Sequence, residues 1–112
     1  TRVEYINNQV IIENYDDTFA FQSGKTISDN LLPLWGGCFI GEQYNFLISG
    51  QGNNEENDEV EVIRVMKYSK DWEYLGQVGL YGANTSSPFN GGSLCCDEYG
   101  DYLYIHTAHL MY

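Results

Sequence analysis

Residues 15–21 read YDDTFAF, and residues 68–74 read YSKDWEY. The two stretches lie 53 residues apart, and both carry aromatic residues at their first, fifth and seventh positions. Each one joins two segments rich in β-branched and aromatic residues through a polar turn, which is typical of a β-hairpin. A hairpin that recurs in this way predicts an internal repeat, in which Phe19 and Trp72 occupy equivalent positions and are each buried between β-sheets.

More of the chain follows the same order. Residues 36–39 (GGCF) align with residues 91–94 (GGSL) at an offset of 55, and residues 46–49 (FLIS) align with residues 103–106 (LYIH) at an offset of 57. Small loop insertions account for the drift in the offset. A period near fifty residues that contains four short strands is the spacing of a β-propeller blade, and kelch-type repeats are the closest in length.

The repeat defines the expected organisation. Residues 1–112 are expected to form a single all-β domain or a propeller fragment, with repeat one at residues 1–53 and a partial repeat two at residues 54–112. The expected fold class is all-β, with antiparallel four-stranded meanders that make about two blades of a β-propeller. The alternative is a chance similarity between two meanders rich in Gly and Tyr. Two blades would leave apolar sheet uncovered, so the chain is expected to self-associate.

The composition excludes several classes of partner. Sixteen acidic residues against five basic ones give a formal charge of −11, which disfavours binding to nucleic acid and to anionic membranes. Ten Tyr, five Phe and two Trp can fill a packed core, so the chain is not expected to be a disordered acidic tail. No apolar run is long enough to span a membrane, and no signal peptide is recognisable.

Periodicity and turn residues place the strands. Helix signals are nearly absent, and hydrophobic alternation bounded by Gly, Asn, Asp and Ser indicates short strands. Strands are expected at residues 9–15, 19–22, 37–40, 44–49, 60–68, 72–80, 92–96 and 102–106, with a turn at residues 97–101.

The three cysteines do not form a disulfide framework. Cys95 and Cys96 are adjacent and cannot easily pair with each other. On a strand one of them would point inward and the other outward. Cys38 and one of the pair are expected to be buried as small apolar residues.

Several segments carry a resemblance to a known group of domains. The order Tyr68-x-x-x-Trp72, Pro88, Gly91-Gly92 and a Tyr-rich strand looks like the kelch order. Residues 33–112 are similar to propeller-like domains of secreted or cell-surface proteins from anaerobic Gram-positive bacteria. The segments that carry this similarity are residues 61–68, 84–89, 92–94 and 106–112. The resemblance implies an extracellular or cell-surface location. The chain departs from that pattern at Cys95, Cys96 and Leu110, so no site residue is carried over.

Two segments contain potential metal ligands. Residues 53–59 (NNEENDE) offer enough oxygen atoms for Ca²⁺, but the order of an EF-hand loop is missing. A solvated loop is the simpler interpretation. His106 and His109 are three residues apart and would point to opposite faces of a strand, so surface or structural roles are expected for both. No metal and no cofactor are predicted.

Catalytic motifs receive no support. Residues 69–72 (SKDW) match only the opening of the sialidase S-x-D-x-G-x-T-W turn, which indicates a turn with a packing Trp. Asp97 and Glu98 are adjacent turn acids and are expected to be solvated, whereas glycoside hydrolysis needs two carboxyl groups across a bond. Nucleophile elbows and phosphate-binding Gly loops are absent from the sequence.

Two classes of function remain. The first is a non-catalytic extracellular recognition or scaffold module, whose surplus aromatic residues bind a carbohydrate or a protein at the cell surface. The alternative is a truncated part of a propeller-fold polysaccharide hydrolase or lyase, with its catalytic residues outside this chain.

Overall fold

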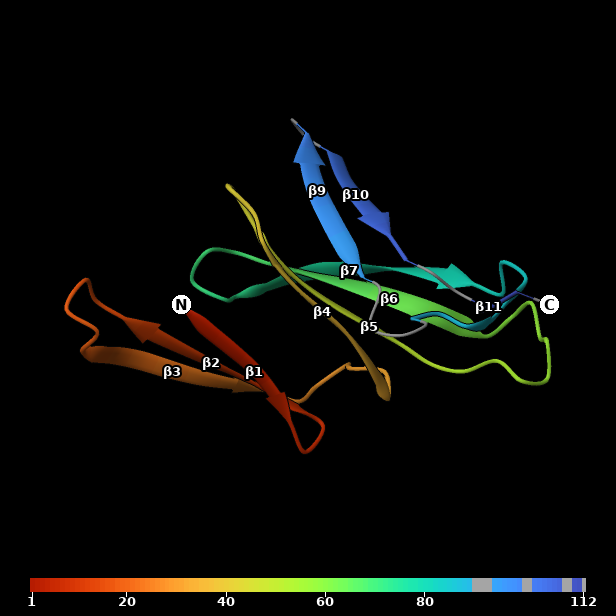
Figure 1. The fold of residues 1–112 in the computed structure, drawn as a ribbon, viewed down its shortest axis with the longest axis horizontal. Helices are drawn as coiled ribbons and strands as arrows, with labels where there is room; N and C mark the ends of the chain where they lie inside the picture. Colours follow the sequence, from red (N-terminus) through yellow and green to blue (C-terminus); the bar gives the residue numbers. More distant parts are fainter. Residues whose placement is uncertain (90–93, 100–101, 108–109, 112) are drawn as a thin grey trace. The chain divides into compact units, whose positions relative to one another are not determined.

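The computed structural model describes residues 1–89, 94–99, 102–107 and 110–111, the last two by their backbone only. Within these residues the chain is all-β and contains no helix, which confirms the expected fold class at that level. All strand pairs are antiparallel (Figure 1). The strands are β1 (Arg2–Ile6), β2 (Gln9–Tyr15), β3 (Phe21–Ile27), β4 (Leu34–Ile40), β5 (Asn45–Gly50), β6 (Glu61–Tyr68), β7 (Tyr74–Tyr81), β8 (Thr85–Ser87), β9 (Cys95–Tyr99), β10 (Tyr102–His106) and β11 (Leu110–Met111).

The chain divides into two compact units, Thr1–Leu31 and Leu32–Tyr112. The boundary between these units, after residue 31, does not coincide with the expected boundary between the sequence repeats, after residue 53. Strands β5 and β6 lie on either side of residue 53 and pair within one sheet. The start of a sequence repeat can be placed at any point of its period, so a repeat and a compact unit need not have the same bounds.

The first unit is a three-stranded meander in the order β1-β2-β3. Its apolar core contains Val10 and Ile12 on the central strand and Ile27 at the end of β3. A two-residue turn of Asn7 and Asn8 joins β1 to β2, and both residues have positive φ angles of 53° and 63°. Asn tolerates this left-handed backbone, which matches the right-handed twist of the flanking strands.

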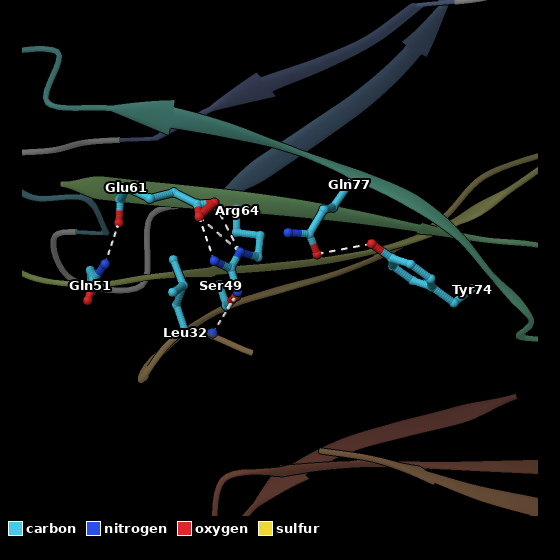
Figure 2. Close-up of polar contacts among 7 residues, drawn as sticks. All are labelled: Leu32, Ser49, Gln51, Glu61, Arg64, Tyr74 and Gln77. Atoms are coloured by element: carbon cyan, nitrogen blue, oxygen red, sulfur yellow. Dashed lines mark hydrogen bonds and ion pairs between the residues drawn. The ribbon is translucent and has the colours of Figure 1, made fainter. Parts of the chain in front are cut away.

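The second unit contains a four-stranded meander in the order β4-β5-β6-β7, two short strands (β8 and β11) that pair, and the hairpin β9–β10. Leu47 and Met66 are paired across the two central strands, and both are fully buried, as is Val62. Figure 2 shows the polar group beside this core: the Arg64 guanidinium binds both carboxylate oxygens of Glu61, at 2.6–3.1 Å. The side chain of Gln51 donates to the Glu61 carbonyl oxygen at 2.8 Å.

The two turns that opened the sequence comparison share one hydrogen-bond pattern. In the first turn the Asp16 amide donates to Ala20 O and the Phe19 amide donates to Asp16 O. In the second, 53 residues later, the Ser69 amide donates to Glu73 O and the Trp72 amide donates to Ser69 O.

The side-chain bonds of the two turns match as well. An oxygen of the Asp16 side chain accepts the amides two and four residues on, and the Ser69 hydroxyl does the same. Phe19 and Trp72 both have a left-handed backbone, with φ of 64° and 65°.

The rings beside the two turns also correspond. Tyr15 packs edge-on against Phe21, with centroids 5.8 Å apart, and Tyr68 packs edge-on against Tyr74 at the same distance. Each pair lies across a strand bulge. Residues 15–21 and 68–74 are therefore equivalent in structure as well as in sequence.

Other sequence predictions are corrected by the structure. Phe19 is 88% exposed, so the prediction that it is buried is wrong, whereas Trp72 is 3% exposed and its predicted burial is confirmed. Strands β3 and β7 begin after these two residues, because each occupies the left-handed position of its turn. Residues 97–99 lie in β9 and not in a turn, and the alignment of residues 91–93 lies outside the described residues.

Candidate binding surface of the second unit

The hairpin β9–β10 has two distinct faces. Burial alternates strictly along both strands, as expected when one face of a hairpin lies against other residues. The half-buried face carries Cys96, Glu98, Leu103 and Ile105. The exposed face carries the residues that alternate with them: Cys95, Asp97, Tyr99, Tyr102, Tyr104 and His106.

Three tyrosines form a cluster on the exposed face, and we call Tyr99, Tyr102 and Tyr104 the tyrosine cluster. Their exposed fractions are 63%, 71% and 49%. Tyr99 and Tyr104 meet edge-on with centroids 5.6 Å apart, and the Tyr102 ring lies 6.5 Å from that of Tyr104. The Tyr99 hydroxyl donates to Asp97 at 3.5 Å. These contacts hold the rings in place while leaving ring surface open to solvent.

A pocket of about 300 Å³ adjoins this cluster through Tyr102. Its lining combines Tyr44 and Lys67 from the four-stranded sheet with Glu98 from the hairpin, and it also includes Gln43, Phe46 and Leu103. The Lys67 ammonium sits 3.8 Å from the centroid of the Tyr44 ring, a cation–π contact that keeps both groups at the wall. The pocket therefore offers a carboxylate, an amide, an ammonium and aromatic rings.

The turns around this pocket are fixed by polar contacts. The Glu42 amide donates to the Glu98 carboxylate at 3.0 Å, which joins the β4–β5 turn to the hairpin. The Lys70 ammonium, in the β6–β7 turn, donates to Gly41 O at 2.6 Å and to the Asn45 side chain at 2.7 Å. These two bonds join the β6–β7 turn to the β4–β5 turn. A Cβ at residue 41 would lie 2.7 Å from Tyr44 O and also meet Glu98, so the turn requires glycine there.

The cysteines lie where the alternation rule placed them, with less burial than predicted. Cys95 is exposed and Cys96 is half-buried, as expected of adjacent strand residues. Cys38 is half-buried rather than fully buried. Burial, with a smaller contribution from Cys96, raises the pKa of the Cys38 thiol to about 11, so this thiol stays protonated and unreactive at neutral pH.

The acidic loop at residues 53–59 is held in shape by the side chain of Asn53, and its carboxylates are not arranged as metal ligands. Asn53 is buried, accepts the Asn57 amide at 2.9 Å and donates to Asn57 O at 2.9 Å. Its own amide donates to Ser86 O. Glu55, Glu56, Asp58 and Glu59 remain exposed. Across the described part of the chain, no group of three or more His, Cys, Asp or Glu side chains is placed to hold a metal ion.

The other candidate residues do not converge. His106 is exposed on β10, and His109 lies outside the described residues. Asp97 and Glu98 are neighbours on β9 and point to opposite faces of the hairpin, so they cannot act on one substrate bond together. The tyrosine cluster was not identified from the sequence, although alternation along residues 102–106 signals it.

Comparison with known proteins finds no matching family model, no matching curated protein and no matching solved structure. Among the described residues, no helix is long and apolar enough to cross a membrane. The function must therefore be argued from the surface itself.

Proposed function

We propose that this protein is a non-catalytic extracellular recognition module that binds carbohydrate through the tyrosine cluster and the adjoining pocket. The observation that carries the proposal is the position of Tyr102, which belongs both to the exposed cluster and to the wall of the polar pocket. The rings and Glu98 lie on opposite faces of the hairpin, so a ligand that uses both would pass from the rings around the hairpin at Tyr102 into the pocket.

The chemistry of this surface suits a sugar chain. Aromatic rings present flat apolar surface on which the C–H face of a pyranose can lie, and Tyr adds a hydroxyl at its edge. Specific orientation needs a few placed polar groups, which Glu98, Gln43 and Lys67 provide. Because the rings and the turns are fixed by contacts within the protein, little order has to be gained on binding.

The same proposal includes the architecture. The four-stranded meander β4–β7 would be a propeller-type blade, and β9–β10 would begin the next one. This is supported by the equivalent turns at residues 15–21 and 68–74 and by hairpin residues that share pocket walls with the sheet, Ile105 with Val65 and Val78. Neighbouring blades bury each other's apolar faces, which suits the half-buried face of the hairpin.

A glycan array tests the function directly. The 112-residue chain should retain a defined set of oligosaccharides, and Tyr102→Ala should lose most of that signal. Tyr81→Ala removes another exposed tyrosine, which lies on β7 outside the cluster, and should leave the signal unchanged. The alternative, a propeller-fold polysaccharide hydrolase or lyase, has its catalytic residues outside these 112 residues, so the reducing-sugar assay on the bound glycans uses the complete gene product. That product should show no cleavage, and cleavage would instead favour the alternative.

A further inference from the structure

Strand β7 forms one edge of the four-stranded sheet and differs from the other edges of the three-stranded and four-stranded sheets. None of its eight residues, YLGQVGLY, carries a charge, although the chain has a net charge of −11. Its apolar side chains are exposed, with Val78 at 70%, Leu75 at 51% and Leu80 at 46%. Long, uncharged, exposed edges are templates for pairing with another strand, and soluble proteins usually protect them.

The other edge strands of the three-stranded and four-stranded sheets carry that protection. In the first unit β1 contains Arg2 and Glu4, and β3 contains Lys25. At the opposite edge of the four-stranded sheet, β4 is interrupted by a bulge between Trp35 and Gly37. Charges and bulges both discourage edge-to-edge pairing. Between Gly76 and Leu80, β7 has neither.

The backbone direction at this edge follows from the hydrogen bonds of the sheet. The Gln51 amide donates to Val62 O, so even-numbered residues of β6 direct their backbone groups toward β5. Backbone groups alternate between the two sides of a strand, so the odd-numbered residues of β6 face β7, where Val65 pairs with Val78. The amides and carbonyls of Gln77 and Gly79 therefore point out of the edge. The Gln77 side chain does not cap them, because it accepts the Tyr74 hydroxyl at 3.1 Å (Figure 2).

We infer that two copies of this chain associate by antiparallel pairing of β7 with β7 about a two-fold axis perpendicular to the sheet. Such an axis keeps the faces of the two sheets aligned, so Val78 and Leu80 of one copy lie beside the same residues of the other. Gly76, on the same face as Val78 and Leu80, leaves room for these side chains, since no heavy atom beyond its own chain neighbours lies within 4 Å of the position that a Cβ would take there. A second copy fits this edge because the approach of two β7 strands brings no charged strand residue against another, although the chain is strongly acidic.

Two substitutions test the inference through different physical effects. Gln77→Pro removes an outward N–H and leaves the β6–β7 bonds intact, since proline is tolerated where the N–H faces away from the sheet. Val78→Lys places a charge close to its own symmetry mate. Thr26→Lys adds the same charge to an exposed position of β3 and serves as the control.

Sedimentation equilibrium over about a hundredfold range of concentration measures the effect. The unmodified chain should show a monomer–dimer equilibrium that strengthens with salt, because salt screens the acidic charge. Both β7 variants should weaken the dimer at least about tenfold while keeping the circular dichroism of the unmodified chain, and Thr26→Lys should not weaken it. A chain that stays monomeric, or a dimer insensitive to both β7 variants, would overturn the inference.

Discussion

At the scale of single residues, Phe19 and Trp72 provide a matched pair. They occupy the same left-handed position of equivalent turns, but Trp72 is 3% exposed and Phe19 is 88% exposed. Because both residues have the same backbone conformation, the difference in the free energy of unfolding between the two Ala variants reports the burial of the side chain. We expect Trp72→Ala to lower the free energy of unfolding by about 3–5 kcal/mol. Phe19→Ala should change it by less than about 0.5 kcal/mol. Urea denaturation measures both, and equal costs would contradict the assignment.

The two turns also predict a difference in pH dependence. The Thr18 hydroxyl and the amides of Ala20 and Thr18 donate to Asp16, and these bonds hold its pKa below the ordinary value. A lowered pKa contributes stability at pH values above the ordinary one, and this contribution is lost as the pH falls through the lowered pKa. The first turn should therefore loosen in acid.

In the second turn the Ser69 hydroxyl accepts the two equivalent amides, and unlike a carboxylate it does not titrate. Asp16→Ser should keep the first turn formed and remove its acid sensitivity, whereas Asp16→Ala should lose both bonds. Amide NMR shifts of Thr18 and Ala20, followed from neutral pH to about pH 2, report the titration. A midpoint above the ordinary Asp pKa would contradict this account.

At the scale of elements, the acidic loop at residues 53–59 should respond little to calcium. Its order comes from the buried Asn53 side chain, and its carboxylates are exposed rather than gathered. Stabilisation by a ligand grows as RT ln(1 + [L]/Kd), so a weak site gives a small shift. Calorimetric melting with and without about 10 mM Ca²⁺ checks this, and a chelator-reversible rise beyond about 10 °C would show a real site.

The sequence predicts those elements whose hydrophobic pattern is uninterrupted. The bounds of β2 and β10 are as expected, because their turn residues and alternation agree. The start of β3 was misplaced because Phe19 adopts the left-handed backbone, which aromatic residues rarely do and no sequence rule indicates. The missed strand β1 had a usable signal in the pair Asn7-Asn8, which suits a tight hairpin turn.

At the scale of the whole molecule, burial on a given strand face depends on what packs there. Residue type alone indicated that Phe19 and Trp72 would both be buried, and only the folded chain distinguishes them. The tyrosine cluster was not predicted from the sequence for the same reason. Composition reveals a surplus of Tyr, but the pairing of Tyr102 with Tyr99 and of Tyr104 with Asp97 is needed to bring the rings together.

The most direct test of the recognition proposal is an NMR titration with the oligosaccharide that the array retains best. Amide shifts should concentrate on the exposed face of β9–β10 and on Glu42, Gln43 and Tyr44, which border the pocket. Shifts should be small at Tyr81, which lies on β7 and lines no part of the pocket. A shift at Tyr81 as large as those at the tyrosine cluster, or none at the cluster, would contradict the proposal that this surface binds carbohydrate.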